Sequence, residues 1–219
     1  MHEVNVIKMN YNTGRLGNKL FTHFYACSLS IENQCKIENP LDSKISIYEN
    51  KDQENDQLSI ETDSSVYYQE QHVVEKFKRH KARLFLKTEE RDGVFVHVRI
   101  GVGKDYKFLM AGRVPTVEYY REQLKKITTS NRGYISSDWP THGWIVELCE
   151  EFDLKVCSGE PEETIIFGSQ FKNKILSLGT FSWWIGFLGS QNNVLCPNPN
   201  NYPRWHGPIF DCMDDWSKV

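Results

Sequence analysis

A histidine and an arginine close a strongly apolar stretch near the middle of the chain. The run Gly93-Val94-Phe95-Val96 leads directly into His97-Val98-Arg99. Such a run predicts a strand covered on both faces, as central strands of parallel sheets are. In open α/β sheets, ligands bind beyond the carboxyl ends of the strands, where the guanidinium of Arg99 could hold a phosphate. The alternative is a core histidine followed by a solvated arginine.

A second candidate lies near the amino terminus, in the segment Gly14-Arg15-Leu16-Gly17-Asn18. It joins a predicted strand at residues 4–9 to a predicted helix. Free amides and the positive end of the helix dipole attract anions at such a junction, so the segment could cradle a phosphate. Glycines also form ordinary turns, and a short glycine pattern is weak by itself.

A third candidate is Asp138, which ends the segment Tyr134-Ile135-Ser136-Ser137-Asp138. The segment reads as a strand that finishes in hydroxyls and a carboxylate. An ionised carboxylate only accepts hydrogen bonds, so Asp138 could take two of them from the edge of a purine base. The alternative is that Asp138 caps the following helix.

The fourth candidate is the segment from Leu178 to Trp184, where a strand turns through Gly179 into an apolar helix. Thr180, Ser182 and nearby amides would be donors at a helix amino terminus, which is again an anion-binding arrangement. Adjacent tryptophans are more often core residues than stacking platforms, so we interpret Trp183 and Trp184 as core.

Regular alternation of strands and helices positions these candidates. Apolar spacing predicts strands at residues 93–99, 133–137, 154–157, 174–178 and 193–196, with helices near 116–128, 142–152, 162–170 and 181–190. Units of this length predict a parallel sheet with helices on both faces. We place a domain boundary near residue 90, which gives domains at 1–90 and 91–219.

The remaining segments give weaker signals. Apolar spacing predicts helices after Leu16 and over residues 73–85, whereas residues 49–65 are polar and acidic and read as a surface excursion. The proline-rich stretch after Cys196, residues 197–203, is predicted to be irregular.

Size and composition exclude several classes of protein. The chain has 219 residues, 39% of them hydrophobic and 25% charged, which is ordinary for a globular protein. A net charge of −3 argues against a protein built mainly to bind nucleic acid. The start of the chain does not resemble a secretory signal and no run is long enough to span a bilayer, so we expect a cytoplasmic protein. Six dispersed cysteines predict reduced thiols.

Familiar catalytic motifs are missing. Gly103-Lys104-Asp105 lacks the spacing of a Walker A loop, and the sequence contains no Gly-x-Ser-x-Gly, His-Glu-x-x-His or Asp-x-Asp. A diphosphate ligand would therefore be neutralised by protein donors, with Arg99 foremost. We expect no metal and no resident cofactor.

Four segments in order resemble the α-1,2-fucosyltransferase family, which is related to the α-1,6- and protein O-fucosyltransferases. Residues 14–21 are similar to its Gly-x-Leu-Gly-Asn-Gln-Leu-Phe opening, and His97-Val98-Arg99 to its His-x-Arg-Arg-Gly-Asp strand end. Ser136-Ser137-Asp138 resembles its Ser-Asp segment, and residues 179–184 its Thr-Phe-Ser-Trp-Trp block.

The resemblance implies a compact GT-B-like fold of two Rossmann-like halves, the second binding the donor GDP-β-L-fucose and the first facing a glycan acceptor. Transfer would invert the anomeric centre without a metal. The roles implied are catalytic for Arg99 and Asn18, and donor-binding for six residues: Arg15, Gly17, His97, Asp138, Thr180 and Ser182. No nucleic acid or membrane partner is implied, and the oligomeric state stays open.

The chain departs from the family pattern at two places. Ile100 replaces the second arginine, and the Gly-Asp that follows is extended to residues 101–105. Two alternatives therefore stay open: the same scaffold with another nucleotide sugar, or a glycan-binding module without activity. For a general base, the sequence offers Asp105, Glu118 and Asp138 without choosing among them.

Overall fold

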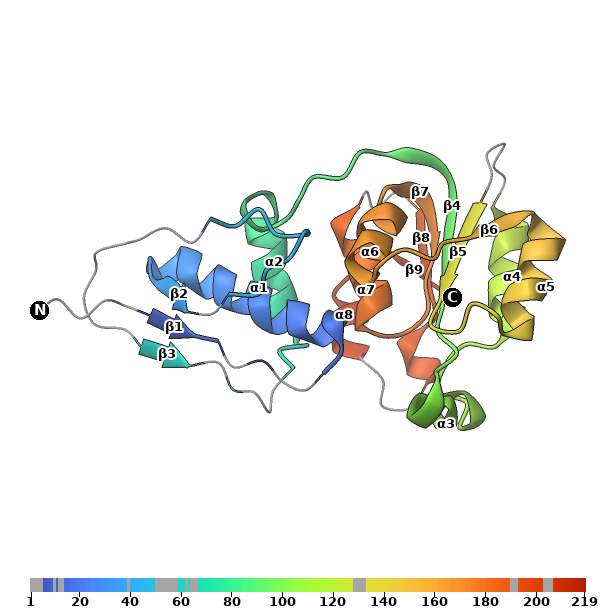
Figure 1. Cartoon of the computed structure of the whole chain (residues 1–219), viewed down its shortest axis with the longest axis horizontal. Helices are drawn as coiled ribbons and strands as arrows, with labels where there is room; N and C mark the ends of the chain where they lie inside the picture. Colours follow the sequence, from blue (N-terminus) through green and yellow to red (C-terminus); the bar gives the residue numbers. More distant parts are fainter. Residues whose placement is uncertain are drawn as a thin grey trace, which may run out of the picture. The chain divides into compact units, whose positions relative to one another are not determined.

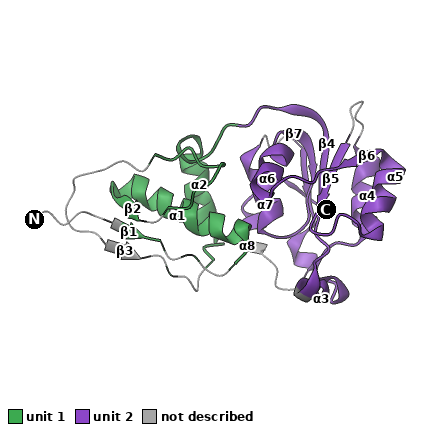
Figure 2. Ribbon diagram, viewed as in Figure 1, with its two compact units in different colours: residues 1–87 green, residues 88–219 purple. Residues whose placement is uncertain are grey.

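The computed structural model describes residues 6–9, 11, 14–38, 40–49, 59–61, 63, 67–127, 133–189, 193–202 and 207–219. Two compact units make up the chain, residues 1–87 and 88–219 (Figure 2). The division falls close to residue 90, where the change in sequence pattern predicts a boundary.

The first unit combines a small parallel sheet with two helices. Its elements are β1 Val6–Lys8, α1 Leu16–Asn33, β2 Lys36–Glu38, β3 Ser59–Glu61 and α2 Gln71–Leu84. The three strands are parallel in the order β2-β1-β3. Aromatic side chains of α1, of α2 and of the C-cap of α2 pack together in the core: the ring centroids of Phe21 and Phe77 are 5.6 Å apart, and those of Phe24 and the C-cap Phe85 are 4.3 Å apart.

Strand β3 corrects one prediction. Residues 59–61 lie in the segment expected to be a surface excursion, yet they pair with β1. A three-residue strand contains too few side chains to show an alternation in the sequence. Residues 50–58, 62 and 64–66 of the same segment lie outside the described residues.

The second unit is a six-stranded parallel sheet with helices on both faces (Figure 1). Its strands are β4 Arg91–Val98, β5 Gly133–Ser137, β6 Leu154–Val156, β7 Phe171–Ile175, β8 Asn193–Cys196 and β9 Ser217–Lys218. Its helices are α3 Tyr106–Met110, α4 Val117–Lys126, α5 Gly143–Phe152, α6 Pro161–Ser169, α7 Thr180–Leu188 and α8 Gly207–Asp211, with short 3-10 turns at Gly103–Asp105 and Pro199–Asn201. The predicted α/β class and parallel sheet are confirmed.

Side chains of β4 alternate between the two faces. Val94, Val96 and Val98 join a core cluster with residues of α4 and α5. The residues between them face the other layer: Phe95 contacts Phe167 of α6, and His97 contacts Ser182 of α7. Because successive side chains of a strand point to opposite faces, the strand must be apolar throughout to be covered on both sides.

The end of the chain differs from its prediction in the bounds of β7 and in two further short elements. Strand β7 ends at Ile175 rather than near residue 178, because the apolar run continues beyond the strand into a buried loop. Among the described residues of the stretch predicted to be irregular, 197–202, the only regular element is the short 3-10 turn Pro199–Asn201; α8 and the edge strand β9, which were not predicted, come after it. Short elements of mixed polarity have no periodicity that a sequence reading can detect.

Within the described residues, no helix combines the length and the apolar character that crossing a membrane requires. The six cysteines are free thiols, four of them buried, as the sequence predicted.

Candidate functional site

The strand order places two predicted segments next to each other. The strands lie in the order β6-β5-β4-β7-β8-β9. Following the chain, β5 and β6 are added on one side of β4, and β7, β8 and β9 are then added on the other side. Ligands of such sheets bind at the carboxyl ends of the strands where the order reverses. Arg99 follows β4, and Gly179 and Thr180 follow β7, so these residues lie at the reversal point.

Arg99 is paired with a carboxylate of the loop that follows it. Its Nη2 lies 3.0 Å from Oδ2 of Asp105, and only 16% and 20% of the two side chains are exposed. Gly101 lets the loop fold back: its φ is +90°, and a Cβ there would lie 2.5 Å from the carbonyl oxygen of Asp105. The extension at residues 101–105 thus returns a negative charge to the predicted phosphate-binding group.

Asp138 holds the same loop from the other side. Its Oδ1 accepts from the backbone amides of Ile100 at 2.9 Å and Gly101 at 3.2 Å, and its Oδ2 accepts from Gly101 at 3.0 Å. Each carboxylate oxygen has about two acceptor positions, so Oδ1 is fully occupied. The predicted bidentate contact with a guanine edge needs correction on this ground. The capping alternative is also wrong, because His142 is the N-cap of α5.

His97 lies inside the second unit, against the first turn of α7. Its Nδ1 and Oγ of Ser182 are 2.5 Å apart, and its ring centroid is 5.0 Å from that of Phe181. Burial lowers the pKa of His97 to about 4, with Asp138 opposing the shift and Arg99 adding to it. The imidazole is therefore neutral near pH 7, and the core-histidine interpretation describes its surroundings.

The helix α7 begins at Thr180, immediately after Gly179, whose φ of +118° favours glycine. Thr180 is buried with a small exposed fraction, whereas Ser182 is completely buried and contacts His97. The prediction that Ser182 reaches a phosphate needs correction, since its hydroxyl positions the imidazole instead. Trp183 and Trp184 are completely buried, so their interpretation as core residues is confirmed.

The predicted residues of the first unit lie at the start of α1. Arg15 is the N-cap of the helix and is exposed, and Gly17 is buried in the first turn. Oδ1 of Asn18 accepts a hydrogen bond from Nε2 of Gln69 at 3.0 Å. This contact orients the Asn18 amide, and nothing in the sequence pattern pointed to Gln69 as its partner.

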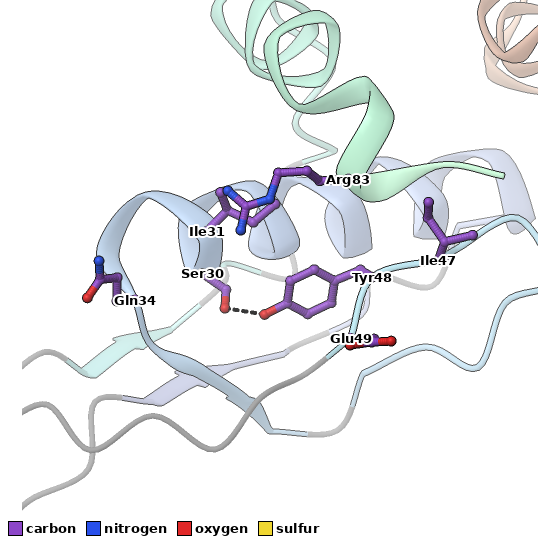
Figure 3. Close-up of a pocket in the computed structure, with 7 residues that line it drawn as sticks. All are labelled: Ser30, Ile31, Gln34, Ile47, Tyr48, Glu49 and Arg83. Atoms are coloured by element: carbon purple, nitrogen blue, oxygen red, sulfur yellow. Dashed lines mark hydrogen bonds between the residues drawn. The ribbon is translucent and has the colours of Figure 1, made fainter. Parts of the chain in front are cut away.

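A hollow of about 440 Å³ lies at the opposite end of α1. It is lined by Ser30, Ile31, Gln34, Ile47, Tyr48, Glu49 and Arg83 (Figure 3). The hydroxyls of Ser30 and Tyr48 are 2.5 Å apart within it. Ser30 is twelve positions after Asn18 in the helix, which is about 18 Å along the axis. The hollow therefore contains none of the predicted site residues, and strand topology is the better guide to the site.

Each of the three candidate general bases already has a partner in the structure. Glu118 is exposed in the first turn of α4 and lies 3.6 Å from Arg121. Asp105 and Asp138 are engaged with Arg99 and with backbone amides, respectively. Among the residues that the structure describes, no cluster of His, Cys, Asp or Glu could hold a metal ion.

The strand order and the position of Arg99 define the second unit as a Rossmann-like α/β domain with a candidate anion site at its carboxyl edge. Comparison with protein-family models, with curated proteins and with solved structures gave no match.

Proposed function

We propose that this protein is a glycosyltransferase whose second unit binds a nucleotide-sugar donor. The donor favoured by the family resemblance is GDP-β-L-fucose, and the acceptor is a sugar hydroxyl of a glycan. The finer fold assignment, a GT-B-like pair of Rossmann-like halves, belongs to the same proposal.

One observation carries the proposal. A half-buried arginine and the amino end of a nine-residue helix emerge from adjacent strands, β4 and β7, at the reversal point of a parallel sheet. The guanidinium of Arg99 and the amides around Thr180 would face the same anion. Guanidinium donors and helix amides together suit a diphosphate, which bears charge on several oxygens.

The chemistry follows from where charge develops. An acceptor oxygen attacks C1 of the sugar, the bond from C1 to the β-phosphate oxygen breaks, and the nucleoside diphosphate departs with that electron pair. The acceptor proton passes to a base or to water. Fixed donors at Arg99 and Thr180 would stabilise the departing diphosphate more than the intact donor, which lowers the barrier.

The first unit has the complementary role in this proposal. The family resemblance gives Asn18 a catalytic role, and Gln69 orients its amide; Arg15 and Gly17 lie at the start of α1, where helix amides attract anions. The acceptor would bind on this unit.

A second candidate donor is favoured by Ile100. Its side chain is completely buried in the cluster of α4 and α5, and its amide donates to Asp138. A side chain directed into the core cannot replace the second arginine of the family motif. Another nucleotide sugar on the same scaffold is therefore the alternative to GDP-fucose.

The test combines binding with turnover. GDP, UDP and ADP and the sugar nucleotides derived from them are compared by thermal shift. A ligand that binds only the folded state raises the stability of the protein. Release of nucleoside diphosphate from the best donor is then measured with and without glycan acceptors, and repeated in EDTA, where transfer should persist. Stabilisation by no nucleotide would overturn the proposal, and stabilisation by UDP above GDP would favour the second donor.

A further inference from the structure

Three rings, two exposed and one half-buried, form a cluster at the carboxyl edge of the second unit. Tyr106 begins α3, Trp139 follows β5, and His142 caps α5. The ring centroids of Tyr106 and Trp139 are 6.1 Å apart, and those of Trp139 and His142 are 5.1 Å apart. Trp139 is 37% exposed and Tyr106 is 38% exposed. Large aromatic side chains at the surface suit ligands with flat apolar faces.

The ring cluster is attached to the candidate anion site by two pairs of consecutive residues. Asp105 pairs with Arg99, and the next residue, Tyr106, contacts Trp139. Asp138 accepts from the amides that follow Arg99, and the next residue is Trp139 itself. The two loops therefore hold the rings and the guanidinium in one fixed arrangement.

The order of the strands determines how far the three rings lie from the guanidinium of Arg99. Trp139 follows β5, Arg99 follows β4 and Thr180 follows β7, and these three strands are neighbours in that order. Neighbouring strands are about 4.8 Å apart. If the phosphates of a ligand bind at the ends of β4 and β7, its nucleobase can therefore lie at the end of β5, which is the next strand beyond β4.

We propose that Trp139, with Tyr106 and His142 beside it, is the stacking platform for the nucleobase of the ligand whose phosphates bind at Arg99. This inference rests on the proposed function, and it names how the base is held. A base offers a flat π-face for stacking whatever its edge groups are. Asp138, by contrast, uses both positions of Oδ1 for the loop amides and contributes no bidentate contact.

The experiment compares a ligand that has a base with one that has none. Calorimetric titration of GDP and of inorganic pyrophosphate is performed on the parent chain and on Trp139→Ala. We expect the variant to bind GDP at least tenfold more weakly, in line with the loss of one base-stacking contact, and to bind pyrophosphate within twofold of the parent. Trp139→Phe keeps a ring and should restore most of the GDP affinity.

A matched control removes an exposed apolar side chain from the same edge. Met110 ends α3, is 73% exposed and has no ring. Met110→Ala should therefore leave the affinities for both ligands within twofold of the parent. If Trp139→Ala is poorly folded by circular dichroism, Tyr106→Ala removes a neighbouring ring of the cluster and provides the comparison instead.

The outcomes separate this inference from the proposed function. Unchanged GDP affinity in Trp139→Ala, together with loss of GDP binding in Arg99→Ala, would overturn the platform and leave the nucleotide site standing. Equal weakening of GDP and pyrophosphate would also overturn the platform, because the effect would not involve the base. Failure of the parent to bind any nucleotide would overturn both.

Discussion

The carboxylate of Asp105 lies 3.0 Å from the guanidinium of Arg99, in the loop directly after the strand that presents the arginine. Only a fifth or less of either side chain is exposed, so water screens this pair less than a surface pair. The arginine at the reversal point of the sheet thus already has an anionic partner. A bound phosphate would share Arg99 with Asp105 or displace it.

Asp105→Asn should tighten nucleotide binding. The amide can still accept a hydrogen bond from Nη2 of Arg99, while the negative charge next to the phosphate is removed. Relief of one repulsion in this setting is worth about 1 kcal/mol, or about fivefold in the Kd for GDP. Calorimetric titration measures the change, with Asp214→Asn as control because it removes one exposed charge elsewhere in the unit. Weaker binding would instead indicate that the charge of Asp105 is needed to position Arg99.

Arg99→Ala should reduce sugar transfer far more than it reduces stability. Loss of a charge-assisted contact to the departing diphosphate would cost about 2–4 kcal/mol of transition-state stabilisation, or about thirty- to a thousandfold in rate. Steady-state release of nucleoside diphosphate gives the rate, and thermal unfolding gives the stability. Arg121→Ala is the matched control, since Arg121 lies on α4 and is also ion-paired, with Glu147 and Glu151 of α5. Activity within threefold of the parent would rule out the proposed role of Arg99.

Asp138→Ala should destabilise the unliganded protein. The substitution removes the acceptors for the amides of Ile100 and Gly101, and each such bond contributes about 1 kcal/mol, so we expect a loss of about 1–3 kcal/mol. Chemical denaturation without ligand measures it. Stability equal to that of the parent would show that water replaces the carboxylate at these amides and would reopen its use for a ligand.

Stability should fall as the pH decreases from about 6.5 towards 4. The lowered pKa of His97 means that the unfolded chain takes up a proton in this range while the folded imidazole stays neutral. The free energy of unfolding therefore decreases with falling pH, by at most about 3 kcal/mol from His97. Below pH 4 the folded imidazole is also protonated, so His97 causes no further decrease. The pKa of His23 in the first unit is also lowered to about 4 by burial and acts in the same direction.

His97→Asn separates the two histidines. The amide can keep a hydrogen bond to Ser182 but does not titrate, so Tm measured between pH 7 and 4.5 should decrease less than in the parent. His23→Gln is the parallel variant for the first unit, where the imidazole contacts the amide of Leu41 and the thiol of Cys27. A Tm profile in His97→Asn that is identical to that of the parent would contradict the lowered pKa.

The sequence by itself determined that the second unit is a parallel sheet covered by helices on both faces. From Gly93 onward, apolar strands and amphipathic helices alternate with complete burial at Val96, Ile135 and Ile175, because both faces of a central sheet must be covered. It also determined that Trp183 and Trp184 are core residues and that Arg99 follows the central strand. These features depend on local periodicity, which a single sequence displays.

Only the tertiary structure decided which partners these residues have. The order of the six strands, which places β4 before Arg99 next to β7 before Thr180, is a choice among many sheet topologies with the same elements. The pairing of Asp138 with the amides after β4, and of Ser182 with His97, joins residues 37 and 85 positions apart. The return of Asp105 to Arg99 depends on the positive φ of Gly101. Contacts between distant segments leave no periodic pattern, because they are fixed by packing and not by the local conformational preferences of the chain.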